Sequence, residues 1–350
     1  MSPVFICAQG KLVDGKLFTI QEQLDCLESH GITFGLVSKR EATRFLTDHT
    51  YFFKLKSYEN NYNRIPATQS DSYRYENLDF AYLQELSLLD TVLKHHVASL
   101  CLDIEYGMKI KLNKLLIDNE NRNLGDQCIS HYFFGRNLSA IVNKHQNPYT
   151  DDLVAACNGN YKVWHLWELL DFNAQIGLHH AYYEVTKQKD TMNNWLFITH
   201  KLRNAVVHGN CLLTNVSCPS ESMRSRRKAD WEVSKPALKM CGKKWQSSTH
   251  ATALQKSLDY LVVNNYAAAL LCHLKLVNSP EVIERTCERM NEFIERICLH
   301  KDDYFGDKDT VEPRNPAIHS VLNALCELST GYATNAQEKA ERLRQQDQAA

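Results

Sequence analysis

A long apolar stripe with helical spacing constrains this chain more than any other feature of its sequence. Between residues 78 and 116 apolar side chains recur every three or four positions, and the stripe includes Leu83, Leu86, Leu89, Leu93 and Val97. This spacing keeps the apolar groups on one face of an α-helix, which other helices must then cover. Segments that alternate apolar and polar residues, as β-strands do, are scarce. The sequence therefore predicts a mainly α fold, a helical bundle with additional helices toward the C-terminus.

Residue patterns typical of helix N-termini and of helical spacing predict further helices elsewhere in the chain. Thr19 followed by Glu22, and Ser38 followed by Glu41, each have the composition of a capping box. The segment VWHLWELLDFNAQIGLHHAYYEV is expected to form one helix, and regular helices are expected again over 251–277, 279–299 and 315–328.

The chain divides by composition into four parts. Residues 1–215 are predicted to form a helical domain, 216–248 a basic irregular insertion, 249–330 a C-terminal helical region and 331–350 a charged tail with little to bury. The formal net charge is −1, but residues 201–250 carry ten basic and three acidic side chains, so this stretch is +7 and the remainder is −8. Such a one-sided distribution favours an anionic partner for the basic stretch.

Cysteine usage and hydropathy indicate the compartment. The 12 cysteines include no Cys-x-x-Cys pair and no Cys/His spacing that would hold zinc, and Cys101, Cys272, Cys287 and Cys298 fall within apolar helical patterns. No stretch reaches the roughly 18 uninterrupted apolar residues of a membrane helix, and MSPVFICAQG lacks the pattern of a secretion signal. We therefore expect a cytoplasmic protein that uses no metal or cofactor and does not enter a membrane.

The segment NNWLFITHKLRNAVVHG is expected to form a helix that begins at one of its paired asparagines and ends at Gly209. Positions four apart share a face of a helix. His200, Asn204 and His208 are therefore predicted to form one polar line, with Arg203 beside it.

Arg203, Asn204 and His208 are the candidate catalytic residues. A histidine can move protons near pH 7, a guanidinium can hold a phosphate with its planar fork, and an amide can orient both. In RNA the 2′-hydroxyl can attack the neighbouring phosphate once a base removes its proton, so this chemistry needs no metal. The spacing alone also occurs by chance in apolar helices, so the pattern by itself leaves both interpretations open.

Four blocks follow one another over about residues 18 to 213: FTIQEQLDCLESHGITF with EATRFLTDHTYFFKLKSY, LDFAYLQELSLLDTVLKHHVASLCLDIEYGMKIKL, VWHLWELLDFNAQIGLHHAYYEV, and finally RNAVVH. Their order resembles the Abi family of abortive-infection proteins, of the AbiD/AbiF type, whose members carry a HEPN ribonuclease core. Asp90 and Glu105 stand at the family's acidic positions. The bundle is accordingly expected to be of the HEPN type.

Two stretches depart from the family's pattern. The motif histidine is followed here by Gly-Asn-Cys, where the family tends to have a further histidine and a nearby arginine. After Asp90 the usual arginines are replaced by the stretch Thr91–Lys94. Substrate contacts that family members make through those positions are therefore not assigned to this chain.

The resemblance implies a metal-independent endoribonuclease, a toxin that arrests a bacterial cell on phage infection. It assigns proton transfer to His208, stabilisation of the phosphorane charge to Arg203 and positioning to Asn204. The products would be a 2′,3′-cyclic phosphate and a 5′-hydroxyl. It also implies a homodimer in which two motifs face each other, and a structured noncoding RNA as antitoxin.

Two other functions stay open. A HEPN-like bundle can hold RNA or a partner protein without cutting anything, and such a module would lose little when the side chain of His208 is removed. A toxin paired with a nucleotidyltransferase antitoxin would instead carry a modification on a tyrosine near the motif.

A second RNxxxH pattern occurs at Arg314, Asn315 and His319. Type VI CRISPR effectors, which this pattern resembles, place two such motifs in one chain. Asparagine followed by proline is also typical of an N-cap and first helical residue, which would leave Arg314 outside the helix that bears His319. The pattern is therefore either a second half-site or a helix start.

The predicted RNA-binding residues lie in the segment RSRRK and are Arg224, Arg226, Arg227 and Lys228. Two tryptophans, Trp231 and Trp245, are nearby in the sequence. Cations neutralise phosphates and aromatic faces stack on unpaired bases, a combination that suits single-stranded RNA. The alternative is a solvated loop that its tryptophans hold to the surface.

Overall fold

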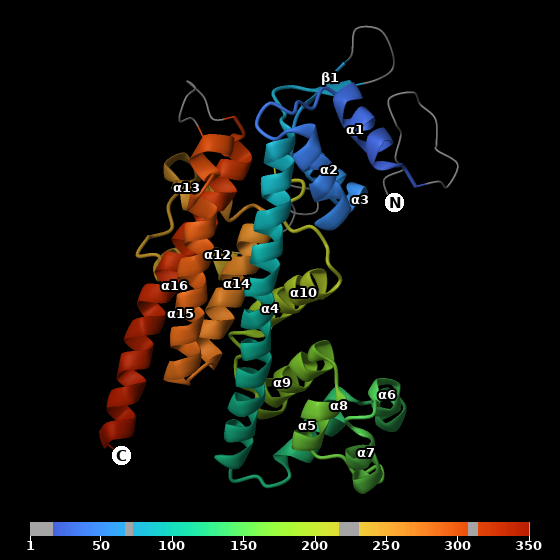
Figure 1. Ribbon diagram of the computed structural model, residues 1–350. Coiled ribbons are helices and arrows are strands. Elements are labelled where there is room, and N and C mark those ends of the chain that lie inside the picture. Colours follow the sequence, from blue (N-terminus) through green and yellow to red (C-terminus); the bar gives the residue numbers. More distant parts are fainter. Residues whose placement is uncertain (1–16, 67–72, 217–230, 307–313, 350) are drawn as a thin grey trace.

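The computed structural model describes residues 17–66, 73–216, 231–306 and 314–349. It is mainly α-helical, as the sequence predicts, and its helices pack into a bundle (Figure 1). The first ten helices are α1 (Ile20–Ser29), α2 (Lys39–Asp48), α3 (Phe52–Ser57), α4 (Phe80–Ile117), α5 (Leu124–Tyr132), α6 (Leu138–His145), α7 (Asp151–Cys157), α8 (Val163–Leu169), α9 (Phe172–Thr186) and α10 (Asn193–Val207). They are followed by α12 (Trp231–Met240), α13 (Ala253–Ser257), α14 (Leu261–Leu276), α15 (Pro280–Cys298) and α16 (Pro316–Ala349). Short helical turns occur at η1 (Tyr58–Asn61), η2 (Ser248–His250) and η3 (Lys301–Phe305), and β1 (Arg64–Pro66) pairs with β2 (Tyr73–Tyr75) in a small antiparallel sheet.

Helix α4 runs along the molecule, with α12 to α16 on one side and α1 to α3, α10 and α5 to α9 on the other (Figure 1). The five residues predicted for its buried stripe are all at most 1% exposed. Further along α4, a Cβ added to Gly107 would lie 3.0 Å from the backbone oxygen of Leu276, at the end of α14. Glycine at this position therefore lets the two helices approach closely. No helix among the described residues is long and apolar enough to cross a membrane.

Both predicted capping boxes are confirmed. In the first, the side chain of Thr19 accepts a hydrogen bond from the backbone of Glu22, whose carboxylate accepts one from the backbone of Thr19 at 2.7 Å. Ser38 and Glu41 make the same pair of bonds at the start of α2. These short helices start where the local sequence satisfies their free backbone N–H groups.

The apolar core does not divide at residue 215. One cluster of buried residues extends from Leu24 to Ala340 and includes α4, α10, α14 and α16. Residues 331–349, expected to be a tail with little to bury, continue helix α16 and bury Tyr332, Ala336 and Ala340. Within the expected irregular insertion, residues 231–240 form α12, which packs against α14 and α16. The N-terminal and C-terminal helices therefore form one core.

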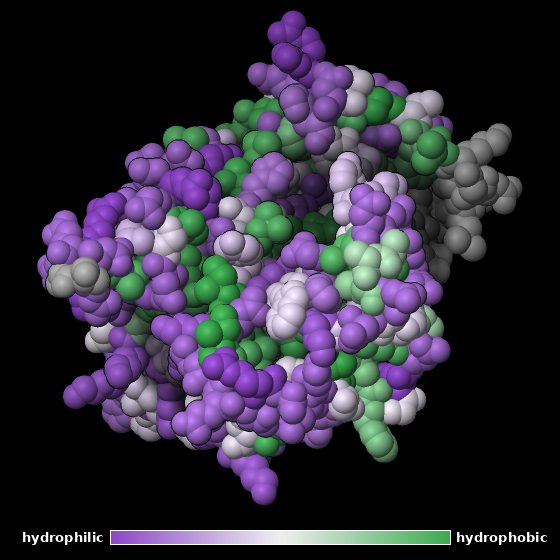
Figure 2. All heavy atoms as spheres, turned by 90° about the horizontal axis from the view of Figure 1, so that it is seen from below, coloured by the Kyte–Doolittle hydropathy of each residue, from purple (hydrophilic) through white to green (hydrophobic). Residues whose placement is uncertain are grey.

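Helices α5 to α9 surround a second apolar cluster, which the end of α4 joins through Leu112. The expected single helix over residues 163–185 is two helices, because the side chain of Asp171 accepts a hydrogen bond from the backbone of Ala174 at 2.8 Å and starts α9. A cavity of about 440 Å³ lies between the end of α4 and the starts of α5 and α8. Figure 2 views the molecule from this end, where apolar residues (green) lie among hydrophilic ones (purple) around a hollow.

One ion pair joins α4 to α15 inside the protein. The guanidinium of Arg296 donates to both carboxylate oxygens of Glu85, at 2.5 and 2.8 Å, and Glu85 is only 3% exposed. Removing one partner of such a pair leaves the other charge buried without compensation, which costs more than the pair itself contributes.

We predict that Arg296→Met lowers the free energy of unfolding by about 3–5 kcal/mol, because Glu85 then stays buried and unpaired. The double variant Glu85→Leu, Arg296→Met should recover most of that loss, since it removes both charges. Urea unfolding followed by circular dichroism measures both values. Equal stability of the single and double variants would show that the pair carries no such penalty.

Candidate functional site

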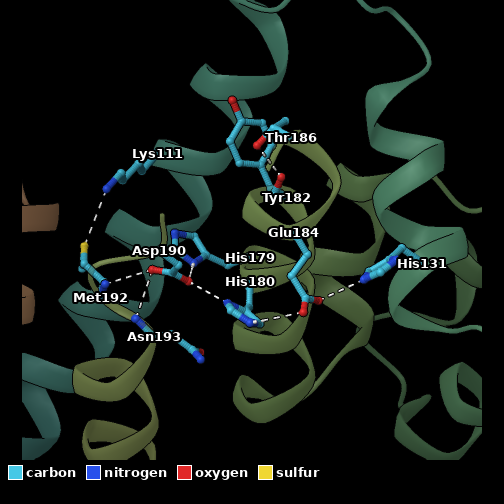
Figure 3. Close-up of polar contacts among 10 residues, drawn as sticks. All are labelled: Lys111, His131, His179, His180, Tyr182, Glu184, Thr186, Asp190, Met192 and Asn193. Carbon is cyan, nitrogen blue, oxygen red and sulfur yellow. Dashed lines mark hydrogen bonds and ion pairs between the residues drawn. The ribbon is translucent and has the colours of Figure 1, made fainter. Parts of the chain in front are cut away.

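Helix α10 carries the RNAVVH motif, and the carboxylate of a residue before the helix caps its first backbone N–H groups. Asp190 accepts hydrogen bonds at Oδ1 from the backbone N–H groups of Met192 and Asn193, at 2.9 and 3.1 Å (Figure 3). The helix begins at Asn193, one of the two asparagines predicted to start it, but the side chain that caps its first N–H groups is that of Asp190. An aspartate just before the helix was the available signal in the sequence.

The other oxygen of Asp190 faces two adjacent histidines of α9. His180 Nδ1 lies 3.0 Å from Oδ2 and His179 Nδ1 lies 3.8 Å from it (Figure 3). From His180 the contacts continue to Glu184, whose Oε2 is 2.9 Å from Nε2 of His131 on α5. Burial lowers the pKa of His179 to about 4, so this ring is neutral near pH 7. The start of α10 is thus joined through polar side chains to α9 and α5.

Within α10, three side chains of the predicted polar group contact one another. Asn204 donates from Nδ2 to Nε2 of His200 at 2.9 Å and accepts at Oδ1 from Arg203 at 3.3 Å. Because Nε2 accepts, the proton of the neutral imidazole is on Nδ1, which is buried without a hydrogen-bond partner among the described residues. Burial lowers the pKa of His200, and Arg203 and Lys201 act in the same direction although Asp171 opposes them. The amide of Asn204 is therefore held from both ends.

Arg203 lies over the middle of α4. Its positive charge lowers the pKa of the Cys101 thiol, although burial outweighs that effect and raises the value to about 12. Glu105, one turn further along α4, pairs with Lys109 at 3.5 Å. Within the part of the chain that the structure describes, no carboxylate forms an ion pair with Arg203, so its guanidinium is available to an anionic ligand.

His208 caps the end of α10 and is exposed. The chain then reverses at Gly209, which has φ of 69°. Gly209 donates to the carbonyl of Val206 at 3.0 Å, and Asn210 donates to that of Ala205 at 2.9 Å. These two bonds form a Schellman motif, which favours glycine at this position. The departure from the family's pattern after the motif histidine thus ends the helix directly behind His208.

The predicted line of three polar side chains is only partly present. His200 and Asn204 are bonded, but the ring of His208 has no hydrogen-bond partner among the described residues. Arg203 and His208 are five positions apart, which turns their side chains by about 140° around a helix. One motif therefore presents its guanidinium toward α4 and its imidazole toward solvent.

A buried aspartate fixes the chain that leaves the motif. Asp90 of α4, fully buried, accepts at Oδ1 from the backbone N–H groups of Leu212 and Leu213, at 2.6 and 2.9 Å. Its Oδ2 lies 2.8 Å from Nζ of Lys94. The acidic position that the family resemblance identified therefore has a structural role, because it ties the segment after His208 to α4.

Asn61 of η1 fixes the same segment from a second direction. Its Nδ2 donates to the carbonyl of Leu213 at 2.7 Å, and its Oδ1 accepts from the backbone of Val216 at 2.9 Å. The carbonyl of Asn61 accepts from the side chain of Asn315 at 2.9 Å. The exit of the first motif is thus linked to the asparagine of the second.

The second RNxxxH pattern has the geometry of a helix start. Asn315 accepts at Oδ1 from the backbone N–H three residues on, at 3.1 Å, directly before α16 begins. Arg314 donates to the hydroxyl of Tyr82 at 2.8 Å, whereas His319 contacts Asp302 at 2.8 Å. Each residue of this pattern is bonded to a different neighbour, so they do not form one site.

The predicted RNA-binding residues Arg224, Arg226, Arg227 and Lys228 lie outside the described residues. Trp231 is the first residue of α12 and is half exposed, and the ammonium of Lys235 lies 4.4 Å from the centre of its ring.

Among the described residues, no group of three or more His, Cys, Asp or Glu side chains could hold a metal ion. Of the four cysteines predicted to lie in the core, Cys101, Cys272 and Cys287 are buried, whereas Cys298 is exposed.

A comparison with known protein families identifies the segment that contains this site. Residues 44–214 match the family model described as Abi-like protein, which is a little under half of the chain. No curated protein and no solved structure matches the chain. The matched segment begins in α2 and ends just after the turn that Asp90 holds. The part of the chain that is similar to Abi-like proteins, residues 44–214, therefore includes the whole motif helix and the aspartate that fixes its exit.

Proposed function

We propose that this protein is a metal-independent endoribonuclease, the toxin of a bacterial abortive-infection system that acts against phage. The observation that carries the proposal is the arrangement at the end of α10. There Asn204 is held between Arg203 and a neutral His200, and His208 is exposed one turn away. The Abi-like match covers all of these residues.

In the proposed reaction, His208 moves the proton of the 2′-hydroxyl or of the leaving oxygen. Arg203 stabilises the negative charge that develops on the phosphorane, and Asn204 keeps the guanidinium in position. The 2′-oxygen bonds to phosphorus and the bond to the 5′-oxygen breaks. The products are a 2′,3′-cyclic phosphate and a 5′-hydroxyl.

A homodimer would complete the site. Because Arg203 and His208 of one chain point apart, a second copy that faces the first can bring the imidazole of one motif to the guanidinium of the other. Helix α4, against which α10 packs, also exposes an apolar row at spacing of four residues. Leu102, Tyr106 and Ile110 in this row are 68%, 67% and 50% exposed. Such a row on a helix is suited to packing against a partner helix.

The control element of the system is proposed to be a structured noncoding RNA that neutralises the toxin. The basic stretch from 201 to 250, with the RSRRK segment at its centre, provides the charge for such a ligand. A non-cutting module that holds RNA or a partner protein is the second candidate. Trp231 and Trp245 are 50% and 46% exposed. Exposed rings can stack on the bases of a bound RNA whether or not the protein cuts it, so they support both candidates to the same degree.

We predict that His208→Ala abolishes RNA cleavage and toxicity on induction, while RNA affinity stays within a few-fold of wild type. The reason is that its proton transfer matters mainly in the transition state. His319→Ala is the matched control, because it removes the histidine of the other RNxxxH pattern, and it should cut normally. Growth curves, cleavage assays and binding titrations measure these effects. Equal toxicity of wild type and His208→Ala would favour the non-cutting module.

A second prediction concerns metal. Because the 2′-hydroxyl, an imidazole and a guanidinium suffice for this reaction, cleavage should continue at an unchanged rate in excess EDTA. Timed cleavage of a labelled RNA with and without chelator is the measurement. Loss of activity with EDTA, restored by Mg²⁺ or Mn²⁺, would assign the cleavage to different chemistry.

A third prediction concerns the dimer. Tyr106→Glu places a charge in the centre of the exposed row, so it should convert a dimer to monomers and remove cleavage together. Leu299→Glu, which alters a similarly exposed leucine at 60% beyond the end of α15, should do neither. Sedimentation velocity and the cleavage assay test both variants. A wild-type monomer that cuts RNA would contradict the dimer.

A further inference from the structure

The cavity at the end of α4 lies away from the motif. Residues of three segments line it: the last turns of α4, the start of α5 and the start of α8. Its volume of about 440 Å³ is within the range of small-molecule sites, about 300–1,000 Å³. Asp90, which holds the exit of the motif, and Leu116, in the cavity lining, belong to the same helix and are separated by roughly 39 Å at 1.5 Å per residue. A ligand in this cavity therefore leaves the proposed catalytic site free.

The apolar part of the lining is closely packed. Val163, the first residue of α8, is only 1% exposed. A Cβ added to Gly125 of α5 would lie 3.3 Å from Cγ2 of Val163, so glycine lets the two helix starts approach each other. The backbone N–H of Lys162 donates to Nδ1 of His165 at 3.1 Å, which fixes the first turn of α8. The shape of the cavity is thus set by packing within the protein.

One aromatic ring of the lining is exposed to solvent. Trp164 is 60% exposed, whereas Trp167 of the same helix is 4% exposed and donates from Nε1 to Oδ1 of Asn113 at 2.9 Å. The ring of Trp164 meets that of His165 at 74°, and no ring among the described residues stacks parallel to it. The indole therefore offers a flat apolar surface, on which the base of a nucleotide can stack.

The charged groups of the lining leave one cation without a partner. Lys162 and Asp126 neutralise each other, because the ammonium lies 2.9 and 2.7 Å from the two carboxylate oxygens. Arg122, between α4 and α5, is exposed, and no carboxylate in the described ranges forms an ion pair with it. A guanidinium has the planar fork that matches a phosphate group. The cavity thus combines an apolar ring with one net positive charge.

Two amide side chains of the lining are held in place. Asn121 donates from Nδ2 to Oε1 of Gln127 at 3.1 Å and accepts at Oδ1 from the backbone of Asn123 at 3.1 Å. These bonds fix the loop on both sides of Arg122. Asn113 accepts from Trp167 at Oδ1, which leaves its NH₂ group as a donor toward a ligand.

We propose that this cavity binds a nucleotide, either free or at the 5′ end of an RNA strand. The base stacks on Trp164, the phosphate pairs with Arg122, and the amide of Asn113 donates to the edge of the base. A purely apolar ligand would leave the guanidinium unused, and an inorganic anion would leave the ring unused. The site does not depend on the proposed nuclease, because it contains no residue of the motif.

The test measures binding of adenosine 5′-monophosphate by isothermal titration calorimetry. The full chain carries His208→Ala, so that the RNA used as a second ligand is not cut. Trp164→Ala should weaken binding at least about fivefold, the lower end of what one stacked base contributes, and Trp164→Tyr should retain most of the affinity. Arg122→Gln should lower the affinity to that of adenosine, which has no phosphate.

Matched controls come from exposed residues outside the cavity. Tyr149→Ala removes a ring that is 98% exposed, and Arg40→Gln removes an exposed arginine of α2; neither should change the affinity. Melting temperatures confirm that the variants fold, and Trp164→Tyr tests the ring separately from any loss of packing in the alanine variant.

A short RNA with a 5′-phosphate, compared with its 5′-hydroxyl form, identifies the source of the nucleotide. If the phosphorylated RNA competes with the mononucleotide and is weakened by the Trp164 and Arg122 substitutions, the ligand is an RNA end. If the mononucleotide alone binds, the ligand is a free nucleotide. No binding of either ligand at millimolar concentration, or equal affinities of the parent and Trp164→Ala, would overturn the site whatever the cleavage assay shows.

Discussion

The burial of helix α4 is the constraint on which the rest of the structure depends. Its apolar residues are covered by the N-terminal helices at one end, by α10, α14 and α15 along its middle and by the α5 to α9 cluster at the other end. The same helix carries Asp90, Lys94 and Cys101 along the side on which α10 and its exit lie. Packing therefore sets the position of the candidate site, because one rigid helix supplies both its apolar support and its buried charge.

Features that depend on local sequence were predictable. The stripe of α4, the capping boxes at Thr19 and Ser38 and the stop at Gly209 each follow from a few neighbouring residues. Features that depend on distant partners were not. Helix α12 forms although Pro236 is within it, and its buried face is covered by α14 and α16. The C-terminal part of α16 has a charged sequence, but three small or aromatic side chains spaced four apart, Tyr332, Ala336 and Ala340, are buried against the core. Lys339 also donates to the carbonyls of Leu274 and Val277.

The candidate site divides in the same way. The RNxxxH pattern and the family resemblance together identified Arg203, Asn204 and His208 as candidates. The contact between Asn204 and His200 follows from helical spacing. The position of His208 at the helix end was predictable too, because it follows from the stop at Gly209. The supporting residues come from elsewhere in the chain. Asp90 and Asn61 precede the motif by more than a hundred residues, and no local pattern connects them with it.

The shared core also has a consequence for the order in which the protein is made. Helix α10 buries Leu196 and Leu202, and its Thr199 contacts Cys272 of α14. A ribosome that has completed α10 must add roughly fifty more residues, several seconds of synthesis, before α14 begins. Until then the motif helix lacks a principal packing partner. The growing chain cannot hold its polar residues in their final arrangement, and assembly of the site waits for the C-terminal helices.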